Sequence, residues 1–443
     1  MPVVPGKKRS GLRGFHGLVA RRDCGYLSRQ FEGTARMHLL KRTMNENNLV
    51  AIYLVFGLAA LGGSVVTILF AASAVWAIIY LSIGKIGWVW RDGIRAFAIA
   101  IGIYIIINIG FFALNFGQNF ASPLSEIRKL APQILFLGAI PVMMRLSLTS
   151  PDVLLRSAPR AAAIGAILVL PLAAFQAFIL GERAEGGSGN AIPFALTCAF
   201  LSVASLVLLL EQDRRVRLLG ILGFLSGYLC IFLSQTKGMM PVPLLGLALV
   251  LVGHLRHKLR LSQIVMIVLA VCVFVAVGIF ASGSYHRLTE VTALAGGAGD
   301  AALSRSTSIR LDLWQKALAA FLQDPISGYG LQNRRALIQE FGYGYSHLHN
   351  GYITALVDNG VVGLLGLVLL LFAPVYIAWK APNDAMREPR LLLALALVLT
   401  YAFGGLSNFI FGHDIYDALF LWGGTIIAVS ATPKVSDDVE GSA

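Results

Sequence analysis

Two histidines close the longest polar segment of the chain, in residues 346–351, Ser-His-Leu-His-Asn-Gly. A long hydrophobic run begins directly after them, which predicts that they lie at a boundary between membrane and water. A neutral imidazole titrates near pH ~6.5 and can take a proton from a hydroxyl nucleophile at neutral pH. We predict that His349 is a general base, the alternative being a solvated or helix-capping histidine. His347 cannot share a helical face with it and is predicted to be a neighbour that shapes the site.

Basic residues in and before this segment could bind an anionic substrate. Arg305 and Arg310 are candidates because arginine keeps its charge and forks onto two phosphate oxygens. Arg310 lies four residues before Trp314, so the two share a helix face; the alternative is a solvated charge. Lys237 is the only charged residue in the turn of residues 234–238, at the predicted outer end of a span. A basic residue is unusual there and indicates a functional site, unless it is a lysine reaching for water.

The remaining candidates are accessory. Asn350 and Trp314 could support the site. Asp414, in a short turn before the last predicted span, could orient a histidine, bind sugar hydroxyls or simply cap a helix. Arg334 and Arg335 are interpreted as surface or lipid-headgroup contacts.

Motifs typical of metal or nucleotide sites are missing from the predicted outer segments, which contain neither an Asp-x-Asp pair nor a His-x-x-x-His pair nor a Gly-rich nucleotide loop. Three of the four cysteines lie in apolar runs and the fourth, Cys24, in the basic N-terminal region, so no disulfide or Cys/His metal framework is indicated. We therefore expect no metal and no cofactor.

The composition predicts an all-α polytopic membrane protein. Of 443 residues, 57% are hydrophobic and only 13% are charged, against about 25% charged in an ordinary soluble protein. The net charge of +13 does not indicate a nucleic-acid partner. Residues 1–43 carry ten Lys and Arg against Asp23 and Glu32, and basic residues beside membrane spans are the expected topology signal.

Apolar runs predict twelve helical spans, with eleven as the alternative because the first two runs meet at Gly62-Gly63. If the N-terminus is cytoplasmic, the 36 Lys and Arg divide into 26 in cytoplasmic segments and 10 in outer segments, as the positive-inside rule requires. The predicted runs are residues 49–62, 64–83, 95–115, 130–148, 161–181, 191–210, 218–234, 241–254, 262–281, 351–379, 391–411 and 416–431.

These runs divide the chain into five parts. Residues 1–48 are predicted to be a disordered, basic cytoplasmic arm, although Met44 is a second candidate for the native start. Residues 49–281 hold spans one to nine and residues 282–350 form a periplasmic loop. Residues 351–431 hold the last three spans, and residues 432–443 form a cytoplasmic tail.

The loop is expected to contain amphipathic helices. Ile309, Leu313, Ala317 and Phe321 make an apolar stripe at helical spacing. A helix-stopping Asp-Pro follows, then a turn, and residues 331–340 can form a second helix. Such helices are predicted to lie on the membrane face rather than to cross the bilayer.

Two sequence blocks together resemble the O-antigen ligase and polymerase superfamily of bacterial lipid-linked glycan transferases. Residues 310–330 give an Arg-x-x-x-Trp helix followed by a Pro-x-x-Gly-x-Gly turn, and residues 349–363 give a His-Asn start followed by a Gly-x-x-Gly span. The resemblance covers about residues 230–370. It implies a GT-C-like glycosyltransferase fold of about twelve transmembrane helices with one large periplasmic loop.

The resemblance also implies an activity. It is the metal-independent, inverting transfer of a glycan from undecaprenyl diphosphate to a hydroxyl of the lipid A-core oligosaccharide, at the periplasmic face of the bacterial inner membrane. His349 would be the base and Arg310 a diphosphate ligand. Where the family often has Ser-Arg-Gly, this chain has Thr236-Lys237-Gly238, so the charge is kept but not the bidentate fork. The alternatives are a polymerase of the same superfamily and, in a different class, a lipid-linked glycan transporter.

Overall fold

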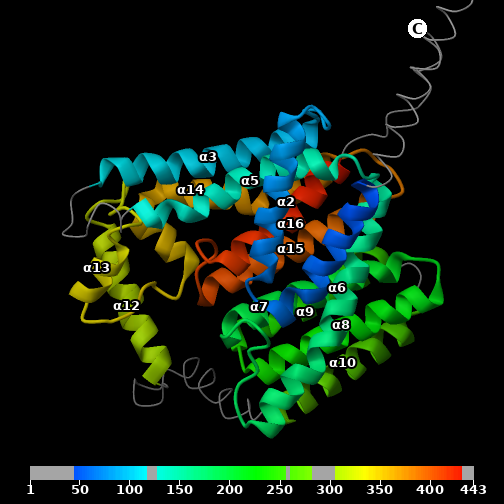
Figure 1. Cartoon of the computed structure of the whole chain (residues 1–443). Coiled ribbons are helices and arrows are strands. Elements are labelled where there is room, and N and C mark those ends of the chain that lie inside the picture. The colour runs from blue at the N-terminus through cyan, green and yellow to red at the C-terminus, as the bar shows by residue number, and fades with distance from the viewer. Residues whose placement is uncertain (1–43, 117–126, 256–259, 282–304, 432–443) are drawn as a thin grey trace, which may run out of the picture. The chain divides into compact units, whose positions relative to one another are not determined.

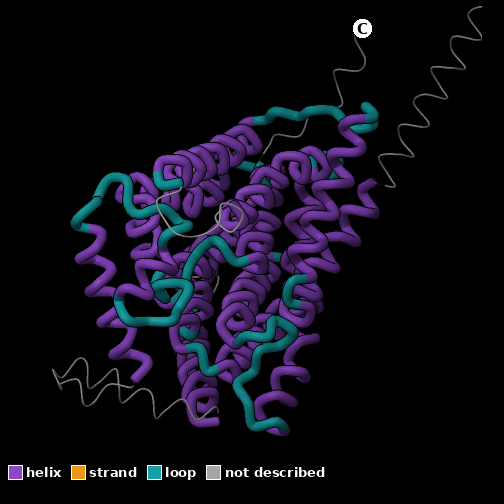
Figure 2. The backbone as a smooth tube through the Cα atoms, turned by 60° about the vertical axis from the view of Figure 1, so that its left-hand side comes forward, coloured by secondary structure: helices purple, strands orange, loops and turns teal. Residues whose placement is uncertain are grey.

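The structure is a computed structural model that describes residues 44–116, 127–255, 260–281 and 305–431. Within these ranges every regular element is helical and no strand is present (Figure 2). The described residues from Asn48 onward form one compact unit. The chain is thus an all-α polytopic membrane protein. Most of the predicted arm, the predicted tail and residues 282–304 of the predicted loop lie outside the described residues.

The described helices follow the predicted apolar runs. Ten of them, from Met44–Gly62 to α15, are long and apolar enough to cross a membrane. Two further predicted runs coincide with shorter helices, Lys237–Gly253 and α16, so the count of twelve spans stays a prediction. After Met44–Gly62 the helices are α2 (Val65–Ser82), α3 (Asp92–Leu114), α5 (Ala131–Leu146), α6 (Pro151–Ala174), α7 (Ala191–Ser205), α8 (Arg214–Ser234), α9 (Pro241–Val250), α10 (Leu261–Ala281), α12 (Arg305–Phe321), α13 (Arg334–Glu340), α14 (Gly351–Lys380), α15 (Arg387–Ser407) and α16 (Asp414–Ser430).

Two helices form the centre of the compact unit. All residues of α7 except Ile192 are buried, and α16 is buried from Ile415 to Ser430. A helix that is apolar all round belongs in an interior. Around them α14 packs along α3 and α15, and α6 packs on α8 (Figure 1). The described part of the predicted periplasmic loop, residues 305–350, is therefore joined to closely packed helices.

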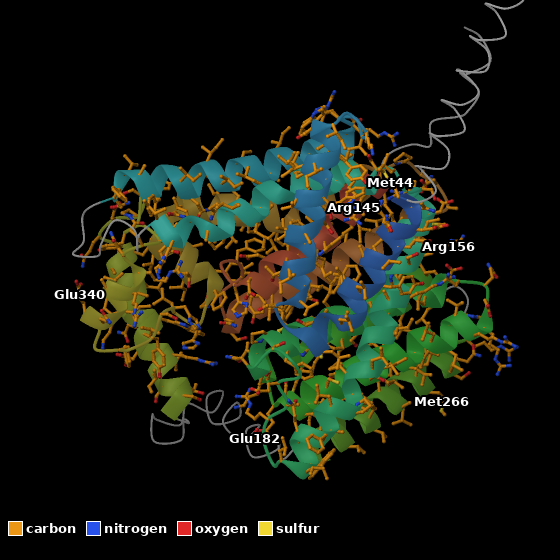
Figure 3. All side chains as sticks on the ribbon, viewed as in Figure 1. Met44, Arg145, Arg156, Glu182, Met266 and Glu340 are labelled. Atoms are coloured by element: carbon orange, nitrogen blue, oxygen red, sulfur yellow. The ribbon has the colours of Figure 1, made fainter. Side chains whose placement is uncertain are left out.

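Helices α12 and α13, here called the flap, lie together at one end of α3 and α14 (Figure 1). The stripe predicted from sequence forms α12, and α13 falls within predicted residues 331–340. Leu313 and Ala317 are fully buried in a cluster with Ile338 of α13 and Val357 of α14. The apolar stripe therefore holds the flap on the span that follows it. Glu340, in the flap, and Arg156 lie on opposite sides of the view in Figure 3.

Helix α14 is broken one third of the way along. Asn359 and Gly360 leave helical geometry, with φ of −137° and +63°. A Cβ atom at Gly360 would lie 2.1 Å from the carbonyl oxygen of Ile326, so only glycine allows the flap's turn to approach this closely.

The turn of residues 325–330 fits into the break and satisfies its backbone. The amides of Tyr329 and Gly330 donate to the carbonyls of Val357 and Asp358 at 2.8 and 2.7 Å. On the other side, the amide of Val361 donates to the carbonyl of residue 325 at 2.9 Å. The Pro-x-x-Gly-x-Gly and Gly-x-x-Gly motifs are thus two halves of one joint that fixes the flap to α14.

Candidate active site

The backbone between the two histidines is anchored from two sides. The Leu348 side chain is fully buried in the flap cluster, and its carbonyl accepts a 2.8 Å hydrogen bond from Nε1 of Trp314 on α12. With Leu348 pointing inward, the rings of His347 and His349 lie on the other side, with centroids 4.3 Å apart. Being two residues apart, they could not share a helical face, but this segment is not helical, and its bends bring the two rings together.

His349 occupies a conformation that is rare for a side-chain-bearing residue, with φ of +53°. The next residue, Asn350, caps α14: its Oδ1 accepts from the amides of Tyr352 and Ile353 at 3.0 and 3.1 Å. The chain must turn sharply to enter the helix from the loop, and His349 takes that turn. Backbone strain of this kind is characteristic of functional sites.

Further aromatic rings extend the histidine pair on both sides. Tyr345 packs edge-on against His349 at 5.2 Å between centroids, and Phe409 packs edge-on against His347 at 4.8 Å. Phe409 in turn stacks with His413 at 5.6 Å. Sequence reasoning missed this row. The alternating spacing of residues 345, 347 and 349 could have revealed its first part, but Phe409 comes from the distant α15–α16 connection.

Burial keeps both imidazoles uncharged. It lowers the pKa of His349 to about 4, with a further contribution from the charge of Arg310. Burial, followed by His349 and the arginines 334 and 310, lowers the pKa of His347 to about 3. Nδ1 of His349 is buried and has no hydrogen-bond partner among the described residues. A proton from a substrate would therefore have to go to Nε2, while Nδ1 carries the other ring proton.

Arg310 is the cation whose charge contributes to the lowered pKa of His349. Its guanidinium is half-buried on α12, and burial lowers its pKa. Among the described residues we find no hydrogen bond or ion pair to this side chain. A partly desolvated arginine without a carboxylate is suited to receive an anion. Arg305 is the first residue of α12, and its side chain lies outside the described part of the structure.

Arg334 is not the surface residue that we expected. Its guanidinium forms a bidentate ion pair with Asp358, with Nε donating to Oδ1 at 2.8 Å and a second bond from Nη2 to Oδ2. The Asp358 carboxylate is buried at the break in α14. Burial alone would lower the pKa of Arg334, but the carboxylate more than offsets this and raises it. Local sequence could not show the pair, because it joins the flap to a residue inside a predicted span.

Lys237 lies in a one-turn helix, Lys237–Met239, after α8. Arg183 holds this turn: Nε donates to the carbonyl of Ser234 at 2.9 Å and Nη2 to Oγ1 of Thr236 at 3.2 Å. The turn also packs on the end of α15, because a Cβ at Gly238 would meet Oγ of Ser407 at 2.4 Å. Phe409 follows two residues later. The turn of Lys237 thus packs on the end of α15, and His347 packs on Phe409 just beyond that end. Arg183 is a cation at this turn that sequence reasoning missed.

The accessory candidates have separate roles. Trp314 and Asn350 position the backbone around His349, as described above. Asp414 lies in the first turn of α16 and its Oδ1 is 3.2 Å from Nδ1 of His413, so the histidine beside it is His413. Its Oδ2 also accepts a long hydrogen bond, 3.4 Å, from Thr67. Within the described ranges, no group of three or more His, Cys, Asp or Glu side chains is placed to hold a metal ion.

Comparison with known proteins adds a decisive observation to this geometry. Residues 221–368, about a third of the chain, match the family model described as O-antigen ligase. This match supports the O-antigen ligase superfamily for the matched part of the chain, residues 221–368. The matched residues include the turn at Lys237, the flap, both histidines and the break in α14. Members of this superfamily are membrane glycosyltransferase-like ligases and polymerases.

One curated relative is similar over a shorter stretch. It is an uncharacterized protein of Haemophilus influenzae, 27% identical over 106 residues. The aligned region covers 21% of this chain and 27% of that relative.

Proposed function

We propose that the protein is an O-antigen ligase of the bacterial inner membrane. In this proposal it transfers a glycan from undecaprenyl diphosphate to a hydroxyl of the lipid A-core oligosaccharide, at the periplasmic face. The observation that supports it best is the pairing of a neutral His349 imidazole with a half-buried Arg310 at the start of a span, inside the region that matches the ligase family.

The proposed chemistry uses the residues of the site as follows. Nε2 of His349 accepts the proton of the acceptor hydroxyl while the hydroxyl oxygen bonds to the anomeric carbon. The bond between that carbon and the diphosphate oxygen breaks, and undecaprenyl diphosphate leaves from the opposite face, which inverts the configuration. Arg310, with Lys237 and Arg305, stabilises the charge that develops on the diphosphate. Because the diphosphate bond already activates the glycan, neither a metal nor another cofactor is required.

A large apolar groove supports a lipid-linked donor. It has a volume of about 910 Å³ and lies between α2 and α5, with Phe70, Ile78 and Leu137 among its lining residues. One end reaches Gly412 and Asp414 in the α15–α16 connection, which also carries Phe409 against His347. A hydrocarbon chain in this groove would have its polar end on the side of the histidines.

Transfer with purified components tests the proposal. The assay offers a lipid-linked glycan donor with either lipid A-core or a second lipid-linked glycan as acceptor. His349→Ala is expected to lower transfer to lipid A-core at least about 100-fold, the usual contribution of a general base. His413→Ala, whose imidazole lies beside Asp414, is the matched control and should stay within about tenfold of the wild type. Normal transfer by His349→Ala would rule out the base.

The acceptor arm separates the alternatives. Extension of the lipid-linked glycan without transfer to lipid A-core would assign the protein as a polymerase. Movement of the lipid-linked glycan across a proteoliposome membrane, with no new glycosidic bond, would assign it as a transporter.

A further inference from the structure

A polar cavity of about 70 Å³ lies beside the break in α14, between α3, α5 and the α15–α16 connection. Tyr104 and Asn108 of α3, Gln133 of α5 and Asn359 of α14 line it. Uncharged polar side chains gathered inside membrane spans are costly, and they usually indicate a ligand or a structural need. The flap's turn already satisfies the backbone of the break, so the backbone there does not need these side chains as hydrogen-bond partners.

Two acceptors in the lining lack donors. Nδ2 of Asn108 donates to the carbonyl of Tyr104 at 2.7 Å, which leaves its Oδ1 to accept from Nδ2 of Asn359 at 3.0 Å. Because a backbone carbonyl can only accept, these two linked hydrogen bonds fix the orientation of both side-chain amides. Oδ1 of Asn359 is therefore the unused end. It is buried without a hydrogen-bond partner among the described residues, and so is Oε1 of Gln133.

The unused oxygens define which ligand chemistry fits. Carbonyl oxygens without donors, next to the Asp358 carboxylate, repel a phosphate oxygen and call for a hydrogen-bond donor. A metal or organic cation is disfavoured because Arg334 and Lys129 also line the cavity. The ligand groups that fit the cavity are therefore neutral hydroxyl and amide N–H groups. At roughly 10–15 Å³ per water-sized group, the cavity takes one edge of a single sugar rather than a whole ring.

The cavity adjoins the histidine pair. Gly351, two residues after His349, lines it, and so does Phe409, whose ring packs against His347. We propose that this cavity is a subsite for the hydroxyl groups of one sugar of the transferred or accepting glycan, held by Gln133 and Asn359. The inference rests on the proposed function, and it adds residues on α3 and α5 that contact sugar rather than diphosphate.

Binding of two probes to the full-length protein tests the subsite. The first probe is a short-chain prenyl diphosphate, and the second is the same lipid carrying glucose, galactose or N-acetylglucosamine. Gln133→Met removes the free acceptor, and no described hydrogen bond is lost with it. Loss of one hydrogen bond to a neutral hydroxyl should weaken binding of the preferred sugar-bearing probe about three- to tenfold. Binding of the sugar-free probe should not change.

Two further variants complete the design. Tyr104→Phe removes another polar group from the lining and is expected to act in the same direction. Gln315→Met makes the same side-chain change on the exposed face of α12 and should change neither affinity. If donor binding is unaffected but Gln133→Met raises KM for the acceptor sugar by the same factor, the subsite holds the acceptor.

The contrary outcomes are distinct. If Gln133→Met and Tyr104→Phe, both folded, leave donor affinity and acceptor KM unchanged, the cavity holds only water and the subsite is refuted. If the wild-type protein binds neither probe, the proposed function is refuted and the subsite with it.

Discussion

The ion pair between Arg334 and Asp358 gives the sharpest prediction about how the fold supports the site. Arg334→Met would leave the Asp358 carboxylate, whose side chain is 7% exposed, without its partner. Breaking a buried pair from one side costs about 3–5 kcal/mol. Because the Arg334 side chain is itself 23% exposed, we expect the lower end, about 3 kcal/mol.

The neighbouring residue offers a matched control. Arg335 is exposed, and Arg335→Met should change stability by no more than about 0.5 kcal/mol. Thermal unfolding of the purified proteins in one detergent, followed by tryptophan fluorescence, measures the difference. Arg334→Met should melt several degrees below Arg335→Met. Since the pair fixes the flap to α14, it should also lower glycan transfer, whereas the control should not.

A double variant shows whether Arg334→Met is destabilised by the unpaired Asp358 carboxylate or by lost packing of the arginine side chain. Replacing both charges, as in Arg334→Met with Asp358→Leu, leaves no unpaired buried carboxylate and should regain much of the lost stability. If the double variant melts below Arg334→Met, or if Arg334→Met melts like Arg335→Met, the pair does not hold the flap in the way described.

Two more predictions concern the loop that carries the histidines. His349 has φ of +53°, where a β-branched residue is strained. His349→Gly should therefore be more stable than His349→Val by about 1 kcal/mol or more. Equal melting temperatures of these two inactive variants would contradict the strained turn. Tyr345 is 38% exposed, so Tyr345→Cys, made in a background without the native cysteines, should react with a membrane-impermeant thiol reagent added to the periplasmic side. Labelling only from the cytoplasmic side would overturn the predicted topology.

Local sequence patterns predicted the helices of this protein well. The apolar runs fell on helices, and the stripe from Ile309 to Phe321 formed α12. Such patterns report on one element and its own periodicity. They also marked the two glycine motifs, although not that these motifs meet at the break in α14.

What the sequence could not show depends on contacts between distant segments. Arg334 looked like a surface charge because its partner, Asp358, lies inside a predicted span. Phe409, which packs on His347, comes from the distant connection between α15 and α16. The contact between the two histidine rings was missed because the segment bends around a buried Leu348 rather than forming a helix. Each miss concerns tertiary packing that no local pattern encodes.

The pH dependence of transfer tests the central claim most directly. The base acts only when its imidazole is uncharged, and burial together with Arg310 lowers the pKa of His349 to about 4. As pH falls, kcat/KM, which reports the pKa values of the free enzyme, should therefore hold through the ordinary histidine range and decline only near pH 4. A decline centred near pH ~6.5, the value for an unperturbed histidine, would show that the ring is solvated and would contradict a base held neutral among cations at the start of the span.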